Sequence, residues 1–329
     1  MKKSLIALAV LATTGAAMAQ SNVTLYGRLD ASVGSEKVNG VSTTQMFSGL
    51  LTTSRWGLRG SEDLGGGLKA NFNLETGIKN DTGEQGTAGS AFDRQSWVGL
   101  SGGFGAVKLG RSDTSFDDIR DLAVSSNLWD SEFTPTKIAY AAGLGDYSSR
   151  ASNQIRYESP NFSGFTVGVS YGLDEQASPV KRDVLSYNLR YRNGGLDAGI
   201  GYQEQKHEAT AGSDREYTAL SAAYDFGSFR VSGGYNRGES RANVKDNEYT
   251  IGVNVPVGAF DFSAGYASMK SKTAGVTTAK SSAFALGLTY ALSKRSKLYA
   301  AYLDGDVKNG AGVKTTDRTL YSVGVRHDF

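Results

Sequence analysis

The feature that most constrains the fold is an alternation of apolar and polar residues that runs from Gln20 to Phe329. A period of two places successive side chains on opposite faces of a strand, so the pattern indicates strands with two different faces. The alternating segments are about ten residues long, roughly twice the usual strand length. We therefore expect an all-β protein with sixteen strands, at residues 22–34, 52–63, 67–79, 92–101, 105–115, 153–159, 164–172, 183–193, 196–206, 215–226, 229–238, 246–256, 260–270, 281–292, 296–306 and 317–329.

The connections between these strands alternate in length. Tight turns such as LGGG at 64–67 and GGFG at 102–105 follow every second strand, and longer polar segments such as 35–51 and 80–92 follow the others. Short turns at one end and long loops at the other are typical of an up-and-down membrane barrel. A soluble β-sandwich would also alternate, because one face of each sheet packs on a core, but its strands would be shorter. We therefore expect a closed transmembrane barrel.

The first nineteen residues have the pattern of an export signal. Lys2 and Lys3 precede an apolar stretch from Leu5 to Ala12, and an A-x-A cleavage site ends at Ala19. We expect residues 1–19 to be removed and residues 20–329 to form one barrel domain. No later segment contains the roughly 20 consecutive apolar residues of a spanning helix, so any membrane crossing must use strands.

Composition excludes several other classes of function. Loss of Lys2 and Lys3 lowers the 35 basic residues to 33, which equals the 33 acidic residues, so we expect no nucleic acid partner. The chain has no cysteine and only two histidines, His207 and His327. We therefore expect neither a metal nor a cofactor.

Three segments resemble the trimeric general porins of Gram-negative bacteria, in particular the neisserial-type branch: VTLYGRLDASV at 23–33, SRWGLRGSEDLGGGLKANFNLETG at 54–77 and RQSWVGLSGGFGAVKLGR at 94–111. The last strand, with Tyr321 and the terminal Phe329, is similar to the carboxyl-terminal assembly signal of outer-membrane barrels. The resemblance implies a sixteen-stranded barrel in the cell outer membrane, a homotrimer, and passive diffusion of small hydrophilic solutes and ions. It also implies outer-membrane lipids, lipopolysaccharide and the barrel-assembly machinery as partners.

The faces of the strands can be assigned because Arg or Lys on the lipid face costs about 2–4 kcal/mol at the middle of the membrane. On this basis Trp56, Leu58, Phe72, Leu74 and Trp97 face lipid, and the charged residues Arg28, Asp30, Arg55, Arg59, Lys69, Glu75 and Arg94 face the lumen. By this resemblance, Arg28, Arg55 and Arg94 correspond to the basic residues that form one wall of the porin constriction. Arg59 corresponds to a neighbouring basic residue in the lumen. Arg156 is the candidate for a further arginine after the third loop, with Arg150 as the alternative.

The third long connection, roughly Phe116 to Ser152, is the longest in the chain. The resemblance implies that it folds into the barrel and sets acidic side chains opposite the basic wall. The candidates are Asp117, Asp118, Asp121, Asp130 and Glu132. Such an arrangement would create a transverse electric field, and the number of arginines favours a weak preference for anions.

Two other functions stay open at this point. A substrate-specific porin, for example for sugars, would carry aromatic residues along its lumen, and the tyrosines here alternate ambiguously. A barrel enzyme would need a nucleophile and a base on one side of the barrel. The chain has no G-x-S-x-G motif, and neither His207 nor His327 lies in a suitable setting.

Overall fold

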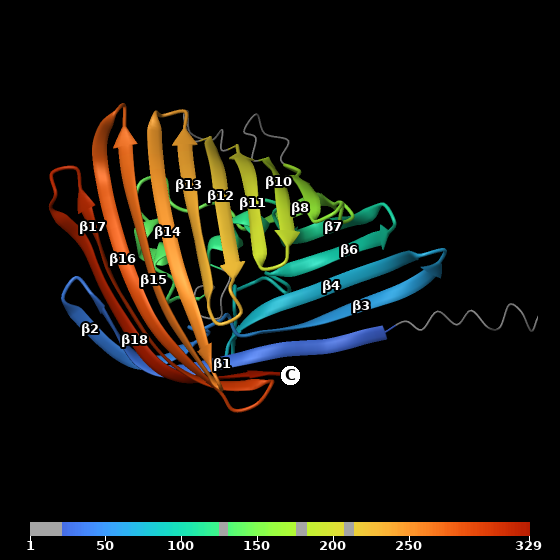
Figure 1. Cartoon of the computed structure of the whole chain (residues 1–329), viewed down its shortest axis with the longest axis horizontal. Coiled ribbons are helices and arrows are strands. Elements are labelled where there is room, and N and C mark those ends of the chain that lie inside the picture. The colour runs from blue at the N-terminus through green and yellow to red at the C-terminus, as the bar shows by residue number, and fades with distance from the viewer. Residues whose placement is uncertain (1–21, 125–130, 176–182, 207–213) are drawn as a thin grey trace, which may run out of the picture.

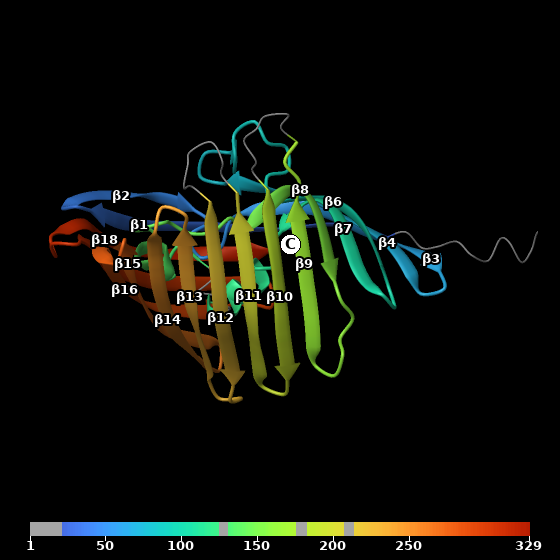
Figure 2. The same ribbon diagram turned by 90° about the horizontal axis from the view of Figure 1, so that it is seen from above.

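The computed structural model describes residues 22–124, 131–175, 183–206 and 214–329. These residues contain eighteen strands, of which β2 (Val41–Ser48) and β5 (Glu84–Gln85) lie in connections and the other sixteen form the wall of one antiparallel barrel (Figures 1 and 2). The wall strands are β1 (Asn22–Val38), β3 (Arg55–Gly65), β4 (Leu68–Lys79), β6 (Gln95–Gly102), β7 (Gly105–Asp113), β8 (Arg150–Glu158), β9 (Phe165–Gly172), β10 (Val184–Asn193), β11 (Leu196–Gln205), β12 (Arg215–Asp225), β13 (Arg230–Ser240), β14 (Val244–Val257), β15 (Phe260–Thr273), β16 (Val276–Ala291), β17 (Ser296–Asn309) and β18 (Lys314–Asp328).

The barrel closes where the two ends of the chain meet. β1 pairs with β18 over eleven residue pairs, from Arg28 opposite Asp328 to Val38 opposite Arg318. Beyond this ladder the terminal Phe329 and Gly27 exchange two backbone hydrogen bonds, of 2.9 and 3.1 Å. A Cβ on Gly27 would lie 2.4 Å from the Phe329 ring, so only glycine fits beneath the terminal aromatic side chain. The closed sixteen-stranded barrel confirms the predicted fold class.

The connections after β1, β13 and β15 differ from the prediction. The predicted loop at 35–51 is mostly a hairpin of β1 and β2, whose turn places Asn39 and Gly40 at φ of 50° and 88°, as a type I′ turn requires. The predicted polar loops after β13 and β15 are also tight turns: three residues separate β13 from β14, and two separate β15 from β16. Here the polar segments continue as paired strands, which period-two hydrophobicity alone does not reveal.

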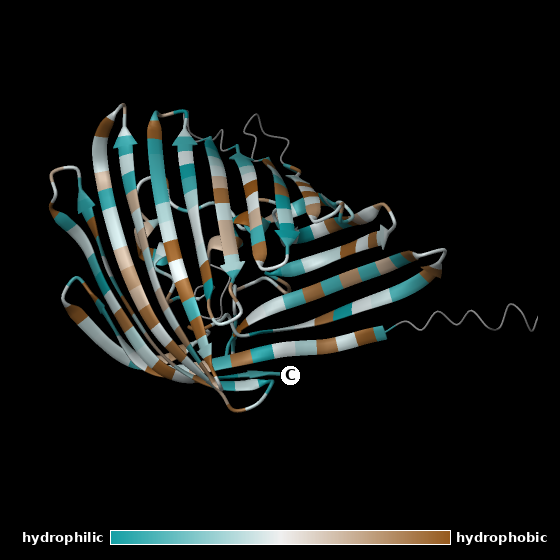
Figure 3. Ribbon diagram, viewed as in Figure 1, coloured by the Kyte–Doolittle hydropathy of each residue, from teal (hydrophilic) through white to brown (hydrophobic). Residues whose placement is uncertain are grey.

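The outer face of the wall is apolar. Leu25, Val98 and Leu220 are 58–59% exposed, which is typical of a surface that faces lipid and unusual for a surface that faces water. Along most strands, hydrophobic and hydrophilic residues alternate, as Figure 3 shows. No helix in the four described ranges is both long enough and apolar enough to cross a membrane.

Aromatic side chains form two rows on the outer face of β9 to β17. Near the short turns lie the ring pairs Phe165–Tyr191, Tyr224–Phe226, Phe226–Phe229 and Phe260–Tyr290, at 4.5–4.7 Å between centroids. Nearer the long-loop end lie Tyr187–Tyr202, Tyr235–Tyr249 and Phe284–Tyr302, at 5.1–5.8 Å. Two such girdles mark the two membrane–water interfaces of a barrel. Among the described residues, no comparable ring pair lies on the outer face of β1 to β8.

Trp97 corrects one predicted face. Its cross-strand partner on β4 is Asn73, which faces the lumen, whereas the neighbouring Val98 is 58% exposed on the outer face. Trp97 therefore faces the lumen, where the Lys108 ammonium lies 5.2 Å from its ring centroid. The segment SWVGL alternates in either register, and Val98 and Leu100 lie on the outer face instead of Trp97 and Gly99.

The core of the molecule lies inside the barrel. The described part of the connection between β7 and β8 carries three short helices, α2 (Asp117–Arg120), η1 (Asp121–Val124) and α3 (Thr136–Ala139), which lie within the ring of strands (Figure 1). The buried hydrophobic clusters form between this connection, which we call the inward loop, and the inner faces of β12 and β15 to β18.

Candidate functional site

The inward loop packs against one half of the barrel wall. Phe116 and Ile119 are fully buried against Tyr217 and Ala219 of β12, and farther along Phe133 and Ile138 pack on the inner faces of β16 and β17. The wall makes room with small residues at the contact, among them Gly199, Gly201, Ala219, Ala267, Ala283, Ala285 and Ala301. A Cβ on Gly199 would lie 2.4 Å from Cδ1 of Ile119. The small residues therefore allow close packing of the loop.

Hydrogen bonds fix the loop along its length. The Ser281 hydroxyl donates to the carbonyl of Ala139 at 2.5 Å, and the Ser232 hydroxyl donates to the carbonyl of Ala123 at 3.0 Å. The backbone N–H of Leu144 donates to the Asp246 carboxylate at 2.7 Å. Because these bonds join the loop to β13, β14 and β16, the open passage is confined to the opposite half of the barrel.

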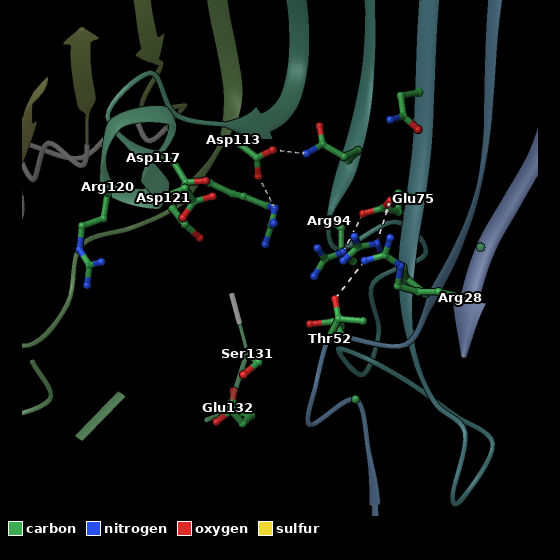
Figure 4. A pocket seen from close by; sticks show the side chains of 18 of the residues that line it. Arg28, Thr52, Glu75, Arg94, Asp113, Asp117, Arg120, Asp121, Ser131 and Glu132 are labelled. Carbon is green, nitrogen blue, oxygen red and sulfur yellow. Dashed lines mark hydrogen bonds and ion pairs between the residues drawn. The ribbon is translucent and has the colours of Figure 1, made fainter. Parts of the chain in front are cut away.

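The passage contains a cavity of about 980 Å³ between the inward loop and the wall formed by β1, β3, β4 and β6 to β8. Figure 4 shows the two sides, with Arg28, Glu75 and Arg94 on the wall and Asp117, Arg120 and Asp121 across from them. We call the wall side the basic wall; its cationic residues are Arg28, Arg55, Arg59, Arg94, Lys108 and Arg150. Four of these, Arg28, Arg55, Arg59 and Arg94, were predicted to face the lumen, and all four line the cavity.

Antiparallel pairing accounts for how the arginines gather. Arg28 of β1 lies directly opposite Arg55 of β3. Glu75 of β4 lies opposite Gly57 of β3, and Arg59 follows two residues after Gly57, toward the short-turn end of the barrel. Arg94 precedes β6, and its backbone N–H donates to the carbonyl of Glu75 at 3.2 Å. The pairing therefore gathers four arginines from two strands and one loop on the same side of the lumen as Glu75.

The basic wall is only partly neutralised. Glu75 is 8% exposed and pairs with both Arg94, at 2.7 Å, and Arg55, at 3.4 Å. Arg28 pairs with Asp328 at 3.2 Å. Arg59 lies 4.8 Å from the ring centroid of Tyr26, and none of the described carboxylates forms an ion pair with it. One carboxylate shared by two arginines and one arginine without a carboxylate leave this wall with excess positive charge.

The opposite side of the cavity carries mixed charge. Asp117, Asp121 and Glu132 of the predicted acids line it, together with Asp146, Arg120 and Lys137. Glu132 pairs with Lys137 at 2.9 Å, and Arg120 lies 4.6 Å from the ring centroid of Tyr140. The Tyr147 hydroxyl donates to Asp117 at 2.5 Å. Burial, followed by the nearby carboxylates of Asp121 and Asp113, raises the pKa of Asp117 well above its usual range.

The remaining predicted site residues lie elsewhere. Arg156 is 4% exposed beneath the inward loop, where it pairs with Asp118 at 2.6 Å, and neither residue lines the cavity. Arg150, the alternative, does line the cavity and pairs with Asp113 at 2.7 Å. Asp30 is fully buried and accepts hydrogen bonds from the Tyr299 hydroxyl and the Thr52 N–H.

Lys69, a further lumenal candidate, is exposed near the short turn between β3 and β4, away from the cavity. Asp130 and His207 lie outside the described residues. Tyr321 and His327 are on the outer face, where the His327 ring hydrogen bonds with Ser296 at 2.8 Å.

Sequence reasoning missed several residues that line the cavity. Lys108 and Trp97 could have been found from the strand register, since Lys108 lies opposite Gly99 and Trp97 opposite Asn73. Asp328, which pairs with Arg28, could have been found in the same way. Arg120, Lys137 and Asp146 lie on the inward loop, whose irregular backbone carries no periodic signal.

Comparisons with known proteins agree with this architecture. The sequence profile of the Gram-negative porins matches residues 4–310. The chain belongs to the Gram-negative porin family. It is 38% identical to the outer membrane porin protein 32 of Delftia acidovorans and 29% identical to the major outer membrane protein P.IB of Neisseria sicca, in each case over the full length of both chains.

Solved structures place the porin in the same fold. The anion-selective porin from Comamonas acidovorans superposes with a TM-score of 0.81 at 32% identity, covering 94% of this chain and all of the other. OmpT of Vibrio cholerae, in its trimer form, superposes with a TM-score of 0.72 at 17% identity, covering 94% of this chain and 99% of the other, which shows the fold alone. The porin is thus an outer-membrane protein that crosses the membrane with many strands.

Proposed function

We propose that this porin is a general diffusion channel that passes small hydrophilic solutes and ions and prefers anions. The observation that carries the proposal is the excess positive charge on the basic wall of the cavity. Arg55 and Arg94 share Glu75, and none of the described carboxylates pairs with Arg59. An anion that follows this wall meets cations that the protein itself leaves incompletely neutralised.

The roles of the site residues follow from the same geometry. Arg28, Arg55, Arg59 and Arg94 form the basic wall of the constriction, and Arg150 joins them in place of Arg156. Asp117, Asp121 and Glu132 lie across the passage. The field between the two sides orients water and dipolar solutes and disfavours apolar ones. The solved relative described as anion-selective, at 32% identity, supports the same preference.

We also propose that the porin assembles as a homotrimer through the outer faces of β1 to β8. Girdle aromatics belong at an interface with lipid, and the ring pairs lie on β9 to β17. The face without them is still apolar, with Val23, Leu25 and Val98 all 58–59% exposed. An apolar face without paired girdle rings, on which exposed aromatic residues such as Trp56 and Tyr157 stand singly, suits contact with another protomer better than contact with lipid headgroups.

Two further proposals complete the function. Residues 1–19 act as a signal peptide that is removed on export, so sequencing of the mature protein should begin at Gln20. The porin acts without catalysing a reaction: transport depends on the passage alone.

Planar bilayer recordings test the proposed channel. Purified porin should insert with conductance steps in groups of three, and in a salt gradient the reversal potential should have the sign of anion preference. The current should stay proportional to solute concentration, because a general pore has no saturable site. Insertion without conductance would contradict the channel itself, and saturable block by one sugar would favour a substrate-specific porin instead.

A further inference from the structure

The first residues of the inward loop, 113–118, run along polar side chains on the lumenal faces of β8, β9 and β10. The backbone N–H of Ser115 donates to the Ser170 hydroxyl of β9 at 3.1 Å. The backbone N–H of Phe116 donates to the Ser186 hydroxyl of β10 at 3.4 Å. Side chains of the wall therefore hold the start of the loop, because its backbone has left the strand pairing.

Arg156 of β8 makes the largest set of contacts in this region, and its side chain is only 4% exposed. Nη1 donates to the carbonyls of Asp113 and Thr114, at 2.7 and 3.2 Å. Nη2 donates to the carboxylates of Asp118 and Glu158, at 2.6 and 3.0 Å. The planar guanidinium thus reaches four acceptors at once, whereas a lysine ammonium has three donors on a single atom.

The charges around Arg156 balance. Among the described residues, Asp118 forms an ion pair with Arg156 alone, and its other hydrogen bond comes from the Asn188 amide at 3.1 Å. Glu158 also pairs with Lys108, at 2.8 Å. Two cations and two carboxylates therefore form one network, in which Asp118 depends on Arg156 for its only opposite charge.

This ion pair bears on which carboxyl groups of the loop reach the passage. Asp117 and Asp121 are four residues apart, so they lie on one side of α2 and its continuation, and both line the cavity (Figure 4). Asp118 is turned by about 100° from Asp117 around the helix axis. Its side chain does not line the cavity, but it is 29% exposed, so water lies close to its carboxylate.

We propose that Arg156 is a positioning residue for the constriction: it holds Asp118 against the barrel wall, so that this turn presents only Asp117 and Asp121 to the passage. The bonds to two backbone carbonyls fix the guanidinium, and the fixed guanidinium holds the carboxylate. Without Arg156, Asp118 keeps one amide donor, and hydration favours a carboxylate that is directed into the passage. The proposal rests on the proposed channel and adds a residue outside the cavity to those that set its selectivity.

A double-mutant cycle in planar bilayers tests the proposal through the ratio of cation to anion permeability. One charge changes this ratio by about 1.7-fold at about 10 Å from the passing ion and by about fivefold at about 5 Å, in 0.1 M salt. Arg156→Met alone should shift the ratio toward cations. Asp118→Asn should shift it toward anions by no more than about 1.7-fold when Arg156 is present, and by about fivefold in the Arg156→Met background.

Asp121→Asn serves as the matched control, because it removes a carboxyl group that already lines the passage. Its effect should differ by no more than about 1.7-fold between the two backgrounds, as for independent sites. If Arg156→Met merely loosened the loop, the effects of both substitutions would change together. That result, or an equal effect of Asp118→Asn with and without Arg156, would overturn the proposal.

Arg156→Gln carries the same cycle if Arg156→Met does not fold. The glutamine amide keeps donors for the backbone carbonyls of Asp113 and Thr114 but has no charge to neutralise Asp118, so the same difference of about threefold between backgrounds is expected. The cycle compares variants with one another. A cation preference in the unmodified porin would therefore refute the proposed selectivity and leave the role of Arg156 to be decided by the cycle.

Discussion

The double variant Arg55→Ser/Arg94→Ser tests the basic wall most directly. Both guanidinium groups pair with Glu75, so removing them changes the local formal charge from one positive to one negative. At about 5 Å in water each unit charge acts on a passing ion with about 0.8 kcal/mol, which screening at 0.1 M salt lowers to about 0.5 kcal/mol. The loss of two charges therefore destabilises an anion by about 1 kcal/mol and stabilises a cation equally.

The opposite shifts for the two ions combine to about 2 kcal/mol, or up to about a 30-fold change in the permeability ratio at the constriction. Ions that pass farther from the wall interact more weakly with its charges. We therefore expect the permeability ratio to shift toward cations by at least about fivefold. The reversal potential in a tenfold potassium chloride gradient measures this shift. Adding Glu75→Gln to the double variant should restore part of the lost anion preference, because it removes the uncompensated carboxylate.

The matched control is Lys294→Ser/Arg295→Ser, which removes two cations from the turn between β16 and β17, away from the cavity. Its reversal potential should equal that of the unmodified porin. If the Arg55/Arg94 variant also kept that potential while remaining folded and conducting, the assignment of selectivity to this wall would be wrong.

Three further predictions concern the inward loop and the lumen. The raised pKa of Asp117 keeps this carboxyl neutral until the pH rises through that pKa, so anion preference should fall as pH increases, and Asp117→Asn should abolish the fall in a series of reversal potentials. Gly199→Val places atoms against Ile119 and should destabilise the loop packing by about 1–3 kcal/mol, measured as a lower thermal unfolding temperature, whereas Gly103→Val in an open turn should not. In a variant whose single tryptophan is Trp97, aqueous iodide should quench the fluorescence and brominated lipid tails should not; the reverse pattern would contradict the lumenal position of Trp97.

The strands were predictable from the sequence because period two is a local property of the chain. The face of each strand was predictable where charge and apolarity agree, as for Arg55 and Arg59 against Trp56 and Leu58. The prediction failed at Trp97, because an aromatic ring suits either face and only the pairing with Asn73 decides. Arg94 reaches the cavity for a different reason than predicted: it precedes β6 and so does not follow that strand's alternation.

The inward loop explains most of what the sequence could not reveal. Alternation correctly places Arg156 on the lumenal face, but the loop covers that position and pairs Asp118 with it. The loop also brings Arg120 and Lys137 to the cavity. The alternation of residues along the strands does not predict these two cations, because they do not lie on strands. Its path depends on packing against small residues far away in the sequence, such as Gly199 and Ala283. Such contacts are specified by volume and shape, which a single sequence does not state.

The junction of β1 with β18 constrains the order in which the molecule can form. It joins residues 28–38 to residues 318–328, so the pairing that closes the ring has nearly the longest sequence separation in the chain. Contacts of this kind form late, because closing a long loop costs entropy before the contact is made. Until then β1 and β18 are open edges with unpaired backbone groups, which would pair with any other strand they meet. A partly folded chain therefore has its greatest risk of misassociation at its two ends, and the final residue, Phe329, completes the contact that removes both edges.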